Sequence, residues 1–199
     1  MIPKLLLMVD VDGVIVHPVH QEGWAAQIES DLGISRAELQ SEFFAPHWHE
    51  IVHGRADLLE VLEEVLHNIA PHLNAKVLMD YWFSRDSRLD EALLGQLAEL
   101  RTQGVTLHLA TLQEHHRARY LWNTLGLSMR FDAMHYAADL GAAKPDLAFF
   151  RAIEVRTGRP SADHFLLDDR QNNVDGALAV GWSAGLWDGS RTLAEILAG

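Results

Sequence analysis

A short apolar run that ends in two aspartates constrains the fold of this chain more than any other feature. Residues 5–9 read Leu-Leu-Leu-Met-Val, and Asp10, Val11, Asp12 and Gly13 follow directly. A continuous apolar run of this length is typical of a strand that is buried on both faces of a parallel sheet. We therefore expect a strand that ends in an acidic turn, where Gly13 lets the chain turn away.

Three later runs share this apolar character, and helical patterns separate them. The runs span residues 105–110, 164–167 and 182–186, and the third is the weakest. A helix is expected over residues 91–103, where Asp90 can cap its first turn. Strands that alternate with helices in this way indicate a parallel, doubly wound sheet, so we predict an α/β fold.

Residues 17–88 differ from the rest of the chain, because they show helical periodicity throughout and no convincing strand. Residues 35–38 form a candidate capping box, residues 57–69 are strongly amphipathic, and residues 74–83 are a further helix candidate. We therefore expect a helical module that is inserted after the first strand and hinged where the chain enters and leaves it.

Asp10 and Asp12 would be costly to place at the end of a buried strand unless a positive charge lay between them. On their own they would favour a simple capped turn. However, polar residues also end the other strands, because Thr111 closes one of them and Asp168 and Asp169 close another. The carboxyl ends of the strands are where an open α/β sheet binds its ligands, so these side chains should meet there.

Lys144 adds a positive charge to the same edge, because it precedes a helix expected over residues 146–157. A hydroxyl such as that of Thr111 and an ammonium group can hold the oxygens of a phosphoryl group. Three or four carboxylates can hold a hard cation such as Mg²⁺, which neutralises the charge of a phosphorylated substrate. The pattern therefore predicts a Mg²⁺-dependent phosphoryl site.

Charge and composition argue against several classes of partner. The chain has 16 basic and 28 acidic residues, and its net charge of −12 argues against binding to nucleic acids and anionic membranes. It has no cysteine, so no disulfide framework or Cys-based metal site is available, and the cytoplasm is the expected compartment. The apolar run near the start is too short to span a bilayer and no cleavage pattern follows it, so we expect no targeting segment. The sequence carries no signal of oligomeric state.

Four motifs, in this order, resemble those of the haloacid dehalogenase-like hydrolase superfamily: LLLMVDVDGV, LHLAT, GAAKPD and FLLDDRQNNVDGA. The resemblance implies a Rossmann-like α/β core domain over residues 1–16 and 89–199, with an all-helical cap domain over residues 17–88. In detail the chain is similar to the subgroup that contains small sugar-phosphate phosphatases and the phosphatase domain of soluble epoxide hydrolase.

The resemblance implies that Asp10 is the nucleophile that accepts the phosphoryl group, and that Asp12 protonates the leaving alcohol and later activates water. Mg²⁺ would be bound by the Asp10 carboxylate, the Asp12 backbone carbonyl and Asp169. Asp168 and Asn173 would support that shell. A helical cap that closes over the site favours a small soluble phosphate ester as substrate, with sugar phosphates as the first candidate.

Three alternatives compete with a phosphatase. A dehalogenase of the same superfamily would use the same nucleophile, but it characteristically lacks the second aspartate of the first motif. A signalling receiver domain combines a similar residue set, but its candidate aspartate, Asp57, falls inside an amphipathic helix here. A catalytically weak phosphate-binding relative is the third, because Leu112 follows Thr111 where the superfamily usually has asparagine. The neighbouring Gln113 could supply an amide in its place, although it lies one residue late in the motif.

The segment over residues 17–88 also contains His47, His49 and His53. Their spacings of two and four could place two imidazoles together on a helix, as in a zinc site. No carboxylate pattern accompanies them, so we favour histidines that face solvent or line the rim of a pocket. The aromatic residues nearby, such as Trp48 and Trp82, are expected mainly in the core of the cap.

Overall fold

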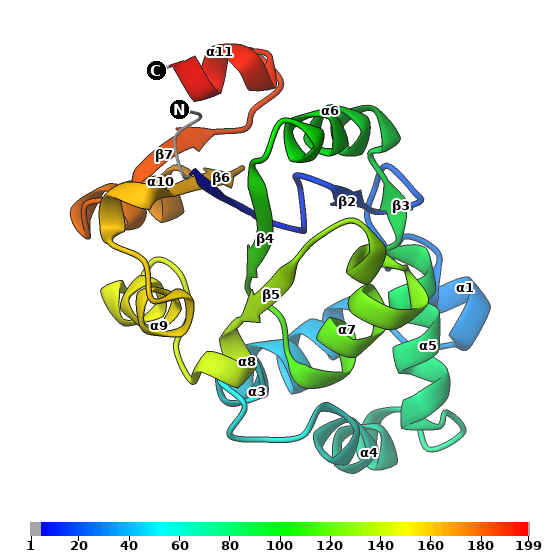
Figure 1. Ribbon diagram of the computed structural model, residues 1–199. Helices are drawn as coiled ribbons and strands as arrows, with labels where there is room; N and C mark the ends of the chain where they lie inside the picture. Colours follow the sequence, from blue (N-terminus) through cyan, green and yellow to red (C-terminus); the bar gives the residue numbers. More distant parts are fainter. Residues whose placement is uncertain (1–4, 199) are drawn as a thin grey trace.

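Five parallel strands form the central sheet of the protein, which a computed structural model describes over residues 5–198 (Figure 1). The strand order is β5-β4-β1-β6-β7, and every neighbouring pair is parallel. The bounds are Leu6–Val9 for β1, Thr106–Thr111 for β4, Ala133–Tyr136 for β5, His164–Asp168 for β6 and Ser183–Leu186 for β7. The predicted doubly wound α/β fold is confirmed. Residues 1–4 and 199 of the expected core domain lie outside the described residues.

The central strand β1 marks the point at which the order of the strands reverses. β4 and β5 lie on one side of it, and β6 and β7 lie on the other. Val9 at the end of β1 is level with Leu109 of β4 and Leu167 of β6. Ligands of open α/β sheets bind at such a switch point, just beyond the carboxyl ends of the strands, and this is where Asp10 emerges.

Both faces of the sheet are buried, which explains the unbroken apolar run of β1. Leu7 and Val9 belong to the apolar cluster on one face, and Leu6 and Met8 belong to the cluster on the other. The helices in the first cluster are α6 (Glu91–Thr102) and α11 (Leu193–Ala198), and those in the second are α9 (Leu147–Thr157) and α10 (Gln171–Ala179). Because side chains alternate along a strand, a strand covered on both sides needs apolar residues at every position.

β5 is a strand that the sequence analysis missed. It pairs only with β4 and therefore forms an edge of the sheet. Of its four residues only His135 is buried, and the others are half-buried. A half-exposed edge strand needs no continuous apolar run, so it lacks the signal by which the other strands were predicted.

The segment between β1 and the rest of the sheet is helical, and its helices gather in the lower part of the view in Figure 1. They are α1 (Ile28–Leu32), α2 (Arg36–Leu39), α3 (Ala45–Val52), α4 (Leu58–Ile69) and α5 (Ala75–Arg85), with a π-helical stretch over Gln40–Phe44. Phe43, Leu62 and Phe83 lie in an apolar cluster of their own. The division into a core domain and a cap domain stays a prediction. No helix in residues 5–198 has the length and apolar character that crossing a membrane requires.

The expectation that residues 17–88 contain no strand was wrong at both ends of the segment. Val16–His17 forms β2 and Arg88–Leu89 forms β3, and the two strands pair antiparallel. Val16 lies opposite Leu89, and His17 lies opposite Arg88. Strands of two residues are too short to produce a periodic pattern in the sequence. The pair joins the two places where the chain enters and leaves the helical segment.

Asp57 does not lie inside a helix, as the sequence suggested, but directly before α4. Its carboxylate accepts hydrogen bonds from the N–H groups of Leu59 and Glu60, so it caps the helix. The other carboxylate oxygen lies 2.8 Å from Nε2 of His116. Capping of α4 and the contact with His116 account for an aspartate at this position, so no role as a phosphoryl acceptor is needed.

Candidate active site

Asp10 directly follows β1, and only 7% of it is exposed. Its N–H donates to the carbonyl of Leu167 at 2.9 Å, which ties the end of β1 to β6. Gly13 completes the turn with φ +82°, and a Cβ atom there would lie 2.3 Å from an Asp169 carboxylate oxygen. The turn therefore needs glycine at this position, and it brings Asp10 and Asp169 to the same edge of the sheet.

Lys144 brings a fully buried ammonium group to Asp10. Its Nζ atom lies 3.0 Å from Oδ1 of Asp10 and 2.5 Å from Oδ2 of Asp168, and it donates to the carbonyl of Ala110 at 2.8 Å. Burial alone would lower the pKa of Lys144, but the Asp10 and Asp168 carboxylates outweigh burial and hold this pKa above its ordinary value. The lysine is therefore a fixed positive charge beside the Asp10 carboxylate.

Asp168, the last residue of β6, is held on both of its oxygens. Oδ2 contacts Lys144, and Oδ1 accepts hydrogen bonds from the Arg170 N–H and from Nδ2 of Asn173, both at 2.9 Å. Asn173 lies on α10 and is buried. A carboxylate with this many partners orients the groups around it. The roles of Asp168 and Asn173 in supporting a metal shell stay predictions.

Asp10, Asp168 and Asp169 form the acidic cluster of the site. Each offers one carboxylate oxygen, and these three oxygens lie within 4.8 Å of one another. Within residues 5–198 no other three or more histidine, aspartate or glutamate side chains are grouped in this way. The Asp12 side chain is not part of the cluster. That its backbone carbonyl would reach a cation stays a prediction.

The acidic cluster carries more negative charge than its protein partners compensate. Burial raises the pKa of Asp10 to about 7 in spite of the Lys144 charge, and the Asp168 and Asp12 carboxylates add to the rise. Burial, helped by Asp168, also raises the pKa of Asp169. Oδ1 of Asp169 is buried and has no hydrogen-bond partner. A cation would provide the missing partner and offset the charge, so these residues fit Mg²⁺.

We expect Mg²⁺ to stabilise the protein more strongly at pH 8 than at pH 6. Because the pKa of Asp10 is raised, the metal-free folded state binds a proton more tightly than the unfolded chain, and its stability falls as pH rises toward about 7. Mg²⁺ offsets that loss once the proton has left. At 100 times its dissociation constant, Mg²⁺ should raise the unfolding temperature by roughly 5–10 °C at pH 8.

Thermal unfolding of the protein and of an Asp169→Asn variant, each with and without Mg²⁺, checks this prediction. The variant should lose most of the response, because the buried oxygen that lacks a partner belongs to Asp169. An equal response at both pH values, or a full response in Asp169→Asn, would contradict the assignment of the cation to this cluster.

Asp12 is contacted by the segment that follows β4. Nε2 of Gln113 donates to Oδ2 of Asp12 at 2.7 Å and to Oγ1 of Thr111 at 3.3 Å. Thr111 and Gln113 are both buried, whereas Leu112 packs against an apolar cluster of the core. An amide therefore reaches the site from the second motif, but it comes from Gln113 and not from the position that Leu112 occupies.

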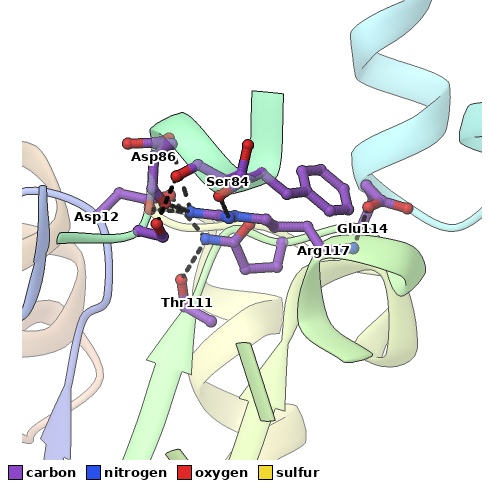
Figure 2. A network of polar contacts seen from close by, with 9 residues as sticks. Asp12, Ser84, Asp86, Thr111, Glu114 and Arg117 are labelled. Atoms are coloured by element: carbon purple, nitrogen blue, oxygen red, sulfur yellow. Dashed lines mark hydrogen bonds and ion pairs between the residues drawn. The ribbon is translucent and has the colours of Figure 1, made fainter. Parts of the chain in front are cut away.

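Arg117 is a site residue that the sequence analysis missed. Figure 2 shows its guanidinium group beside Asp12 and Asp86, and its Nη2 atom lies 3.9 Å and 3.7 Å from their carboxylates. Its helix α7 (His115–Arg119) begins at Glu114, which caps it. An arginine inside a short helix gives no sequence signal of such a contact, because Asp86 lies 31 positions earlier in the chain.

The histidines of the helical segment form no metal site that the structure describes. The rings of His49 and His53 lie 4.4 Å apart, but Nδ1 of His53 is 2.7 Å from the carbonyl oxygen of His49. His49 is exposed, and His47 and His53 are half-exposed. Among residues 5–198 they belong to no group of three ligating side chains.

Sequence comparisons place this arrangement in a known context. A family model described as haloacid dehalogenase-like hydrolase matches residues 5–181. A sesquiterpene phosphatase of Aspergillus oryzae is 31% identical over 100 residues, which cover 47% of this chain and 48% of that protein. The match thus spans about half the length of that curated relative.

Solved structures share the fold over nearly the whole chain. An HAD family enzyme from Bacteroides thetaiotaomicron, in complex with magnesium and inorganic phosphate, superposes with a TM-score of 0.80 at 16% identity and covers 96% of this chain and 98% of its own. An L-2-haloacid dehalogenase from Xanthobacter autotrophicus has a TM-score of 0.64 at 21% identity and covers 99% and 81%. Because the family model extends over most of the sequence, the chain belongs to the haloacid dehalogenase-like hydrolases.

Proposed function

We propose that this protein is a Mg²⁺-dependent phosphatase that hydrolyses a small phosphomonoester through a phosphorylated Asp10. The observation that carries the proposal is the unequal placement of two carboxylates on one turn. Asp10 is buried 3.0 Å from Lys144 and beside the acidic cluster. Asp12 lies outside that cluster, is half exposed, and contacts the Gln113 amide. We therefore assign the attack on phosphorus to Asp10 and the exchange of protons to Asp12.

In the first step, an oxygen of Asp10 forms a bond to phosphorus while the bond from phosphorus to the alcohol oxygen breaks. Asp12 gives its proton to the departing alcohol. In the second step, Asp12 takes a proton from a water molecule whose oxygen attacks the same phosphorus, and Asp10 is released with inorganic phosphate. We assign Lys144 and Thr111 to holding the phosphoryl oxygens during both steps.

The residues that would hold magnesium are Asp10, Asp169 and the backbone carbonyl of Asp12. A magnesium ion there supplies charge neutralisation for the phosphoryl group. Asp168 and Asn173 keep Lys144 and the end of β6 in place through the hydrogen bonds described above. The name of the Aspergillus relative supports the choice of phosphoryl transfer.

The substrate is proposed only as a class of small phosphomonoesters. Sugar phosphates were the first candidate from the sequence, and the sesquiterpene phosphatase relative adds phosphates of apolar alcohols. The helical segment carries a cluster of aromatic rings in which Trp24 and Trp82 stack with centroids 5.0 Å apart and Trp48 lies 5.7 Å from Trp82. Such a cluster is compatible with an apolar leaving group.

A dehalogenase is not favoured as a second function. Its reaction needs no proton donor, whereas Asp12 is present here and held by Gln113. The resemblance to the Xanthobacter dehalogenase is one of fold, at 21% identity. The third alternative, a weak phosphate binder, rested on Leu112, and the Gln113 amide weakens that argument.

Phosphate release from a panel of sugar phosphates, prenyl phosphates and an aryl phosphate tests the proposal. We expect turnover with Mg²⁺, none in excess chelator, and recovery when Mg²⁺ is restored. A 2-chloropropionate reaction followed by halide release serves as the control for dehalogenation. Undiminished turnover in chelator would contradict the metal assignment, and halide release without phosphate release would contradict phosphoryl transfer.

A further inference from the structure

Arg117 is buried, with only 3% of its side chain exposed. A charge in such a place must be paired and hydrogen-bonded, because desolvation is otherwise too costly. Nη1 donates to the carbonyl of Phe83 at 3.1 Å, and Nη2 donates to the carbonyl of Asp86. The carboxylates of Asp86 and Asp12 lie on the same side, at 3.7 Å and 3.9 Å. One guanidinium group thus contacts two distant parts of the chain.

The first part is the end of the helical segment. Phe83 lies in the last turn of α5, and Asp86 follows the helix just before β3 returns the chain to the core. The last carbonyls of a helix have no partner within it, and Arg117 supplies donors to this region. The guanidinium carbon also lies 5.2 Å from the centroid of the Phe83 ring and 5.4 Å from that of Tyr120.

The second part is the proposed proton donor. Gln113 contacts Oδ2 of Asp12, and Arg117 lies nearest to Oδ1. The segment after β4 therefore lies against both oxygens of this carboxylate. That segment is itself fixed, because the Glu114 carboxylate accepts the N–H groups of His116 and Arg117. About half of the Asp12 side chain is exposed, and the contacts with Gln113 and Arg117 restrain it on its buried side. Figure 2 shows Asp12 beside Arg117.

We infer that Arg117 is a positioning residue that links the exit of the helical segment to Asp12, so that docking of the end of α5 sets the proton donor in place. The inference rests on the proposed role of Asp12 in the reaction. Arginine suits this task because its planar group offers several donors in fixed directions. Lysine could keep the charge, but its single nitrogen would replace the two separate nitrogens, Nη1 and Nη2, that reach the carbonyls of Phe83 and Asp86.

The link can be measured with substrates that differ in their need for a proton. Alkyl phosphates need protonation of the leaving oxygen, whereas 4-nitrophenyl phosphate scarcely does. In Arg117→Lys and Arg117→Gln, kcat/KM for an alkyl phosphate should fall by about 10- to 100-fold, and that for 4-nitrophenyl phosphate by at most about threefold. kcat/KM is the suitable quantity because it reports the steps up to the departure of the alcohol.

Arg85→Gln is the matched control. Arg85 lies in the same turn of α5, but its guanidinium pairs with Asp31 of α1 at 2.6 Å and is 39% exposed. Its loss should leave the difference between the two substrates unchanged. An equal loss for both substrates in the Arg117 variants, or no loss, would overturn the inference and leave Arg117 as a structural anchor.

Amide hydrogen exchange provides a readout that does not depend on activity. Arg117→Lys retains the buried charge, so it can be used even if Arg117→Gln does not fold. In this variant, residues 83–88 and the turn over residues 11–16 should both exchange faster. Faster exchange at residues 83–88 alone would overturn the link. If the wild-type protein released no phosphate from any substrate, the proposed function would fail, and the exchange data would still decide whether Arg117 connects the two segments.

Discussion

The Asp10→Asn protein is expected to keep its fold and to lose phosphate release by about 10⁴-fold or more. An amide has nearly the same shape as the carboxylate but cannot attack phosphorus. The unfolding temperature of the metal-free protein should not fall at pH 8, because burial raises the pKa of Asp10 and the neutral amide avoids the cost of a buried charge. Steady-state kinetics with an aryl phosphate and a thermal scan check both parts.

Asp163→Asn is a suitable control for this change. Asp163 directly precedes the first residue of β6, whereas Asp168 is the last residue of that strand. Asp163 therefore lies far from the site, and the same substitution there should leave turnover unchanged. Turnover within tenfold of wild type in a homogeneous Asp10→Asn preparation would show that Asp10 does not carry the reaction. A comparable loss in Asp163→Asn would show that the assay reports general damage.

Lys144→Ala is expected to combine the second-largest loss of activity with a large loss of stability. The ammonium group would be missing beside the phosphoryl group, so kcat/KM should fall by about 10²-fold or more. Asp10 and Asp168 would also remain buried without their cation, which costs about 3–5 kcal/mol for a broken buried pair. The destabilisation should be greatest above pH 7 and shrink in acid, because Asp10, whose pKa burial raises, then takes up a proton.

Kinetics and thermal unfolding across pH 5 to 8 measure this effect. Lys76→Ala is the control, because Lys76 forms an exposed ion pair with Asp80 at 2.6 Å and such pairs contribute little. Near wild-type kinetics in a folded Lys144→Ala protein would reduce Lys144 to a residue that stabilises a loop. Destabilisation that grew toward low pH would contradict the charge pairing described here.

The fold was predictable where strands are covered on both faces. Residues 5–9 form a continuous apolar run, and residues 105–110 and 164–167 are mostly apolar, because each of these strands lies inside the sheet with helices on both faces. β5 escaped prediction because it is a half-exposed edge. β2 and β3 escaped because two residues cannot show a period. The apolar pattern of a sequence therefore indicates which strands are buried, but it does not identify strands that are very short or partly exposed to solvent.

The candidate site was predictable to the extent that parallel strands end together. A strand of one parallel sheet ends at or just before each of Asp10, Thr111 and Asp168. The order of strands and helices in the sequence was therefore enough to predict that these residues lie at one edge of the sheet. Gln113 was predicted only as a possible source of an amide, and Arg117 was not predicted at all. Their partners lie far away in the chain, since Gln113 and Asp12 are 101 positions apart. The Arg117 contacts also depend on how α7 lies against the end of α5, and no local sequence pattern encodes that.

The central claim, that Asp10 and Asp12 are chemically unequal, can be tested by trapping the intermediate. In Asp12→Ala, Asp10 can still attack an aryl phosphate, whose leaving group needs little protonation, but the water that should release the phosphoryl group has lost its base. Mass spectrometry of this variant after mixing with the substrate and Mg²⁺ should find the added mass of one phosphoryl group, located on Asp10. An adduct on any other residue, or one that also forms in the Asp10→Asn protein, would contradict the account.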